Sequence, residues 1–273
     1  METKEQFNKD QMTPEELAAW AEKKQDQRET VNGLADRQLY EVFSDPQELG
    51  AHLKRQATFG KMGVTNVLLI GAQNAEATEV HTFDEWKERG RSVTKGEKAI
   101  AILAPKGEYT GEDGITRNNF VIKNVFDVKQ TYGKELRRRK PAPVRVVVKA
   151  LMANCPIPVV TSDKVKDAQF EPTPYQIAVN RDQSPESKLN AIAREYAKTY
   201  DMGEFVAQCA ANIVCYRYGV NPTPIEQIPE KAALADPAKQ KSLLGFMKTA
   251  ATELSEHIDR QLQAERQRKQ EER

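Results

Sequence analysis

Short apolar stretches at helical spacing alternate with polar ones over the first ninety residues. Residues 13–16 read Thr-Pro-Glu-Glu, which is typical of a helix N-terminus: threonine caps well, proline suits the first turn, and early glutamates favour the helix dipole. The helix that begins there is polar enough to be attached only loosely. Further helices are predicted over residues 46–56, 64–73 and 83–89.

A pattern typical of strands follows. Residues 99–103 form an apolar run between charged residues and Pro105, as in a buried strand. Residues 106–118 contain three glycines, one of them in the pair Asp113-Gly114, and predict a hairpin turn. Residues 120–128 predict the returning strand. The front part is therefore expected to be a small mixed α/β domain, and the whole chain to have an α+β fold.

Prolines mark a change in the middle of the chain. Six of them occur between Arg139 and Pro174, and the apolar residues 144–148 among them are either one more strand or the start of a helix. A mostly helical part follows, with helices predicted over residues 184–200, 204–218 and 242–263. Gly219 is expected to end the second of these helices.

These changes divide the chain into five predicted segments: a helical or flexible extension (1–44), the mixed α/β domain (45–140), a Pro-rich linker (141–171), a mostly helical domain (172–264) and a charged tail expected to fray (265–273).

Composition narrows the class of protein. The 273 residues suggest two globular units, and 41 Lys/Arg against 40 Asp/Glu exclude a uniformly basic surface. The apolar stretch 99–105 is too short to span a membrane, and the first ten residues lack the apolar segment of a secretion signal. Three cysteines without CxxC spacing disfavour both a disulfide framework and a thiolate zinc site. We therefore expect a reduced, cytoplasmic protein.

Charge is nevertheless uneven. Residues 1–30 carry five basic and eight acidic side chains, whereas residues 117–149 carry ten basic and two acidic ones. The second stretch includes Arg137, Arg138 and Arg139. It is the one place where composition alone points to a polyanion, although a solvated linker would have the same composition.

One series of residues resembles a known family. The series begins with residues 66–70, Gln73 and residues 77–78. It continues with Phe-Asp-Glu-Trp at 83–86 and Gly-Arg-Ser-Val-Thr-Lys-Gly-Glu-Lys-Ala at 90–99, and it ends with residues 102–105 and 125–131. This order over residues 45–132 is similar to the N-terminal domain of ArdC-type antirestriction proteins, common on mobile genetic elements such as plasmids and phages. The resemblance implies a domain that binds single-stranded DNA.

The residues themselves allow such a role. Five cations and Trp86 occur within residues 84–98, where cations can neutralise phosphates and an exposed ring can stack on a base. Four carboxylates are interleaved, so the cations must share a face. Trp86 is alternatively a core anchor, because it follows Phe83 at helical spacing, and Gly90 and Gly96 are expected to adopt positive φ. The candidate nucleic-acid-binding residues are Lys54, Arg55, Lys61, Trp86, Arg89, Arg91, Lys95, Lys98, Arg137, Arg138 and Arg139.

The rear part resembles, more weakly, a zincin-like metallopeptidase domain. Residues 175–180 resemble its edge strand, and the HExxH motif of that family falls on residues 194–198, which read Arg-Glu-Tyr-Ala-Lys. Arg194 and Lys198 are cations without a lone pair for Zn²⁺, and Gln208 stands where the third ligand is expected. We therefore predict a degenerate site with no catalytic residues, metal or cofactor. Arg194 and Lys198, one turn apart, could instead form a small anion site.

The leading interpretation is a non-enzymatic protein that binds single-stranded DNA with little sequence preference. An alternative is a protein-interaction module on a pseudo-metallopeptidase scaffold, which binds a protein of the host or of the conjugation apparatus. A residual hydrolase with unidentified ligands is a third. No membrane partner is expected, and the sequence leaves the oligomeric state open.

Overall fold

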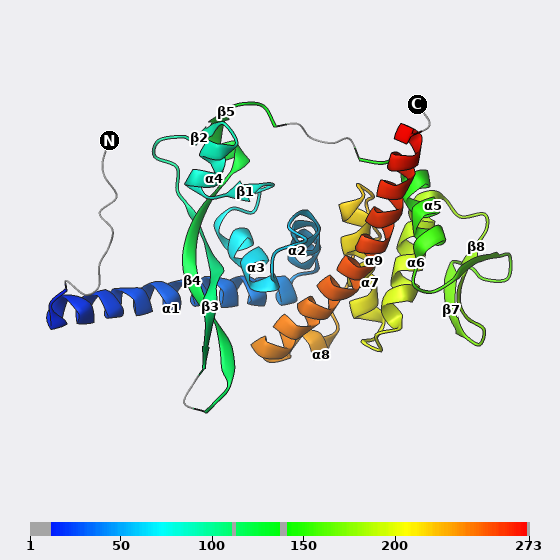
Figure 1. Cartoon of the computed structure of the whole chain (residues 1–273). Coiled ribbons are helices and arrows are strands. Elements are labelled where there is room, and N and C mark those ends of the chain that lie inside the picture. Colours follow the sequence, from blue (N-terminus) through cyan, green and yellow to red (C-terminus); the bar gives the residue numbers. More distant parts are fainter. Residues whose placement is uncertain (1–11, 111–112, 137–140, 272–273) are drawn as a thin grey trace.

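The computed structural model describes residues 12–110, 113–136 and 141–271 (Figure 1). It confirms the α+β fold class. The front part contains helices α1–α4 and strands β1–β5, and the rear part is mostly helical with one small sheet. In the described parts of the chain, no helix is long and apolar enough to cross a membrane.

Helix α1 (Pro14–Ser44) begins where the sequence predicts. The Thr13 hydroxyl accepts the Glu16 N–H at 3.2 Å, and the Glu16 carboxylate accepts the Thr13 N–H at 2.8 Å. The expectation of a loosely attached extension is wrong for the end of this helix, where Val31, Leu39 and Phe43 are buried. The first half of α1 is polar, and the prediction for the whole helix was based on it. The apolar positions that pack against the core begin only at Val31.

Helices α2 (Pro46–Thr58), α3 (Val64–Gln73) and α4 (Phe83–Glu88) confirm the other three predictions in the front part. Strands β3 (Ile100–Thr110) and β4 (Thr116–Asp127) form a long antiparallel hairpin. The predicted strand is therefore too short and the predicted turn too wide. A register shift between Pro105 and Glu108 accommodates Gly107, whose φ is +110°, within the strand.

Three short strands complete the front part. Strand β1 (Val80–His81) pairs with β4, and β2 (Arg91–Val93) pairs with β5 (Thr131–Gly133) through antiparallel bonds. Beside them, a 3₁₀ turn spans Val128–Gln130.

Helix α3 covers the backbone of β3. The Asn66 side-chain amide donates to the Leu103 carbonyl at 2.8 Å and accepts its N–H at 2.9 Å. Gln73 makes the same pair of bonds with Ala101, both at 2.9 Å. Because these amides satisfy backbone groups that another strand would otherwise need, they fix the hairpin to α3 and protect its edge.

The predicted Pro-rich linker contains regular structure. Helix α5 (Val144–Asn154) resolves the alternative left open for residues 144–148, and β6 (Val159–Ser162) follows. Strand β8 (Tyr175–Asn180) pairs in parallel with β6 and antiparallel with β7 (Ala168–Pro172).

The remaining helices are α6 (Pro185–Lys198), α7 (Glu204–Arg217), α8 (Glu230–Ala233) and α9 (Pro237–Glu271). Gly219 follows α7 with φ of +75°, as predicted. Helix α9 begins earlier and ends later than expected, so the predicted fraying tail is helical through Glu271.

One apolar core joins the front and rear parts. It contains Leu39 and Leu53 of the first two helices together with Leu151 of α5 and Ile258 of α9. Helix α2 packs directly on α7. The prolines therefore mark a change of architecture along the chain and do not separate two independent cores.

Candidate nucleic-acid interface

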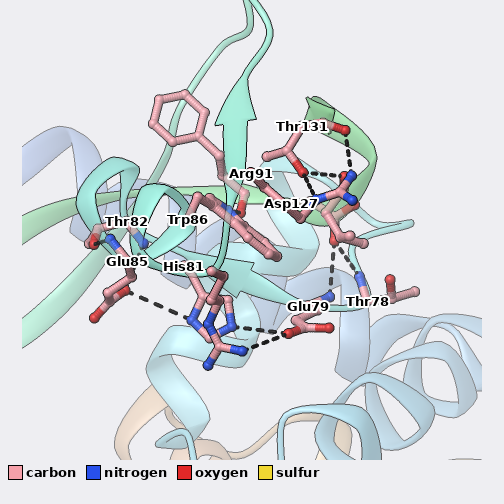
Figure 2. Close-up of polar contacts among 12 residues, drawn as sticks. Thr78, Glu79, His81, Thr82, Glu85, Trp86, Arg91, Asp127 and Thr131 are labelled. Atoms are coloured by element: carbon pink, nitrogen blue, oxygen red, sulfur yellow. Dashed lines mark hydrogen bonds and ion pairs between the residues drawn. The ribbon is translucent and has the colours of Figure 1, made fainter. Parts of the chain in front are cut away.

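Trp86 is a core residue. Helix α4 is capped by Thr82, and its Trp86 indole is fully buried with its N–H donating to the Phe126 carbonyl at 2.8 Å. The His81 ring meets the indole edge-on at a centroid distance of 4.7 Å (Figure 2). The prediction that Trp86 stacks on a base is therefore wrong, and the alternative of a core anchor is correct.

The Arg91 guanidinium holds the chain together locally. Its three nitrogens donate, each at 2.7 Å, to the Thr131 hydroxyl, the Thr131 carbonyl and the Lys134 carbonyl (Figure 2). These bonds tie β2 to β5 and use three of the five N–H donors of the guanidinium, so Arg91 has a structural role. A contact of its remaining donors with a phosphate stays a prediction.

Arg55 also turns out to be structural. It is only 7% exposed between α2 and α3, and burial lowers its pKa. A Cβ atom added at Gly71 would lie 2.4 Å from Arg55 Nη1, so a larger residue there would force the guanidinium to move. Arg55 cannot contact a nucleic acid from this position, contrary to prediction.

Four predicted lysines do reach solvent: Lys54, Lys61, Lys95 and Lys98. The last two flank Gly96, whose φ of +91° forms the predicted turn between β2 and β3, and Gly90 also has the expected positive φ. Arg89 is exposed but lies 3.7 Å from the Glu79 carboxylate. Arg137, Arg138 and Arg139 fall outside the described residues.

A groove of about 680 Å³ runs between the start of α3 and the hairpin. Lys61 lines it together with Lys123 and Phe120, two residues that the sequence did not single out. Phe120 is 45% exposed, and Lys123 lies 3.6 Å from the Glu85 carboxylate. The apolar pattern of residues 120–128 predicted the strand, but the side of the hairpin that faces this groove depends on the tertiary structure.

Carboxylates in this region serve the backbone. Asp127 is fully buried, and its oxygens accept the N–H groups of Thr78, Glu79 and Lys129 at 2.7, 3.0 and 2.9 Å (Figure 2). The backbone N–H of Thr82 hydrogen-bonds the Glu85 carboxylate and holds its pKa below the ordinary value. These acids therefore stabilise the turns around α4, although Glu85 also faces Lys123.

The rear part was predicted to contain a degenerate metal site at residues 194–198. Glu195 is 4% exposed, and one of its oxygens accepts the Phe170 N–H at 3.0 Å. Its other oxygen lies 2.8 Å from Lys198 Nζ and 3.4 Å from Arg194 Nε. The exposed Glu204 of α7 meets the same two cations at 2.7 and 3.5 Å.

This four-residue network decides two points. Both cations are already paired with carboxylates, so the predicted anion site is wrong. Burial disfavours the charged Lys198, but its hydrogen bonds to Glu195 and Glu204 outweigh that effect and raise its pKa. The buried Glu195 therefore neutralises two partly exposed cations.

The donor set does not suit a divalent cation. Gln208 donates to Asn212 Oδ1 at 2.8 Å and lies 3.4 Å from Asn190 Oδ1, so its amide belongs to a polar cluster between α6 and α7. Across the described ranges, no three His, Cys, Asp or Glu side chains are placed to share a metal ion. Two cations at the central positions would also repel such an ion.

The fold defines an α+β protein whose front half is a long hairpin braced by helices. Residues 37–142 match the family model of the N-terminal domain of the anti-restriction factor ArdC, and this part of the chain belongs to that family. The resemblance predicted from residues 45–132 is thereby confirmed.

Two solved structures of antirestriction ArdC from plasmid R388 are similar to the chain. The metal-free form is 20% identical over 72% of this chain and 83% of that one, with a TM-score of 0.44. The Mn(II)-bound form is 19% identical over 79% and 97%, with a TM-score of 0.46. No curated protein sequence matches the chain.

Proposed function

We propose that this chain is a non-enzymatic, ArdC-like antirestriction protein of a mobile genetic element, which acts in the cytoplasm. Its front half binds single-stranded DNA with little sequence preference. The observation that carries the proposal is the family match of residues 37–142 on a domain whose candidate lysines are solvent-exposed. Ammonium groups at such positions can neutralise phosphates without reading bases.

Binding of a labelled oligothymidylate, compared with a duplex of equal length, tests this function. We expect anisotropy titrations to favour the single strand and to weaken steeply as salt increases. Replacing Lys95 and Lys98 by alanine should reduce the slope of log K against log salt by about 1.4, at roughly 0.7 per lost contact. The matched control replaces the exposed Lys164 and Lys166 of the rear half. Failure of the wild type to bind either form would refute the proposal.

The rear half, in this proposal, retains a zincin-like scaffold without metallopeptidase chemistry. Its support is the pairing of Arg194 and Lys198 with Glu195 and Glu204, at positions where the family carries metal ligands. Stoichiometric zinc or manganese in the purified protein, or cleavage of casein by it, would contradict this part.

A protein-interaction module is the second candidate function. An apolar groove of about 600 Å³ between the start of α7 and α9 favours it, because Phe246 lines the groove and is 43% exposed. Leu234, close by in sequence to the groove residues, is 76% exposed. A wild type that binds no oligonucleotide but is recovered with a protein of the host or of the conjugation apparatus, in a manner abolished by Phe246→Ser, would favour this function.

A further inference from the structure

A second groove lies between the β3–β4 hairpin and the first half of α1, where the two elements cross (Figure 1). Its volume is about 780 Å³. Trp20, Lys24 and Arg28 line it from α1, and Lys106 lines it from β3. We call it the α1 groove. Neither the resemblance nor the composition of residues 1–30 singled out any of these side chains.

The basic side chains of the first half of α1 that line the groove share one side of the helix. Trp20, Lys24 and Arg28 follow one another every four residues, so they lie on one side of the helix. Glu22 and Asp26 occupy positions that the helix turns away from that side, whereas Glu16 precedes Trp20 by four residues on the same side and does not line the groove. Among the described residues that line the groove, three are cations and none is acidic.

The hairpin supplies the fourth side chain through its irregular stretch. The register of β3 against β4 shifts between Pro105 and Glu108, and such shifts redirect side chains. Lys106 lies within this stretch, is exposed, and lines the α1 groove. Within the described part of the chain, Lys24, Arg28 and Lys106 form no ion pair with a carboxylate.

The other groove of the hairpin is less suited to a polyanion. There Lys123 is 3.6 Å from Glu85, and His81 is 3.1 Å from Glu79, so acids accompany its basic groups. In the α1 groove, the Arg28 guanidinium makes one long bond, 3.5 Å, to the Phe120 carbonyl and keeps further donors. The basic groups that line the α1 groove therefore have fewer carboxylates beside them than those of the other groove.

The size of the groove fits a short length of an unpaired strand. Trp20 and Arg28 are separated by about 12 Å along the helix axis, which corresponds to roughly three or four nucleotides at the spacing of stacked bases. The half-buried Trp20 lines the groove, where one face of its indole can stack on a base. Bases of a duplex are already stacked on each other, so an indole here favours single strands.

We infer that the α1 groove is the base-stacking part of the single-stranded DNA site. Trp20 stacks on a base, while Lys24, Arg28 and Lys106 neutralise the flanking phosphates. This inference rests on the proposed function and assigns its binding surface to a helix whose first half lies outside the region matched by the family model.

Intrinsic fluorescence provides a direct test, because the chain has two tryptophans and Trp86 is fully buried. Oligothymidylate should quench the emission of the wild type. In Trp20→Phe, which retains an aromatic ring, binding should persist while the quenching disappears. Trp20→Ala should weaken binding about 5- to 150-fold, the range measured for loss of one stacking partner.

Two double alanine variants of α1, one inside the groove and one outside it, provide the matched comparison. Lys24→Ala with Arg28→Ala should reduce the slope of log K against log salt by about 1.4. Lys23→Ala with Arg37→Ala removes the same charge from exposed positions of α1 that do not line the groove, and should leave the slope unchanged. Circular dichroism and urea titration establish that all variants fold.

The outcomes separate the inference from the proposed function. A wild type that binds the single strand, combined with equal slopes for the two double variants or with quenching that persists in Trp20→Phe, overturns the α1 groove and leaves the function standing. A wild type that binds no single strand overturns both.

Discussion

Replacing Glu195 by alanine tests whether this residue is a structural counter-ion. The substitution removes the acceptor of the part-buried Phe170 N–H and of the Lys198 ammonium, 3.0 and 2.8 Å away. Hydrogen bonds to a charged group contribute about 1.5–3 kcal/mol each, and breaking a fully buried ion pair costs about 3–5 kcal/mol.

The network here is partly open, which lowers that figure. The Arg194 and Lys198 side chains are 22% and 33% exposed, and both keep Glu204 as a partner. We therefore expect Glu195→Ala to lower the free energy of unfolding by about 2–3 kcal/mol. Glu195→Gln, which keeps an oxygen for the Phe170 N–H, should cost less than Glu195→Ala.

Urea denaturation at neutral pH measures these differences, with unchanged m-values as the sign that only stability has altered. Glu204→Ala is the matched control, because Glu204 touches the same two cations but its side chain is 61% exposed. It should cost less than about 1 kcal/mol. Equal losses for the two alanine variants, or no loss for Glu195→Ala, would refute the reasoning.

Three further predictions concern the front half. The pKa of His52 is lowered to about 3, first by burial and then by Arg55, so the unfolded chain takes up a proton below about pH 6.5 that the folded one does not. The free energy of unfolding should therefore fall by about 2 kcal/mol between pH 6.5 and 4.5, and urea titrations of His52→Leu should lack that component. Arg91→Lys should lower the free energy of unfolding by about 1–2 kcal/mol in urea titrations, because a lysine ammonium cannot make the three hydrogen bonds of the guanidinium. The affinity for an oligonucleotide should stay within about twofold. A large loss of affinity with unchanged stability would contradict the structural role. Gly133→Ala should lower the free energy of unfolding by more than about 1 kcal/mol, since φ is +127° and the new Cβ would lie 2.6 Å from the Gly90 carbonyl oxygen; an unchanged urea midpoint would contradict that geometry.

Local signals in the sequence predicted most helices well. The Thr-Pro-Glu-Glu cap of α1, the Thr82 cap of α4 and Gly219 after α7 act within one or two turns, and the structure contains all three. The family resemblance also depended on a local series of residues, which the family model matches.

The predictions of binding residues failed where a side chain of the same type can either face solvent or pack inside the protein. The charges of Arg91 and Arg55 suit phosphates. In the structure, however, Arg91 hydrogen-bonds Thr131, which lies far along the chain, and Arg55 packs beside Gly71 between two helices. Trp86 had the same ambiguity and proved to be buried. No pattern within residues 84–98 indicates which of these side chains the returning strand will cover.

The sequence by itself therefore determined the positions of most helices, the presence of the hairpin and the family resemblance of residues 45–132, because caps, turns and apolar periodicity act over a few residues. It did not determine the ends of α9 or the length of the hairpin strands. Only the tertiary structure decided which cations remain free for a ligand. It paired Arg194 and Lys198 with glutamates and placed Lys24 and Arg28 beside Lys106 across the hairpin. The physical reason is that the electrostatic environment of a side chain depends on neighbours that folding brings from distant parts of the chain.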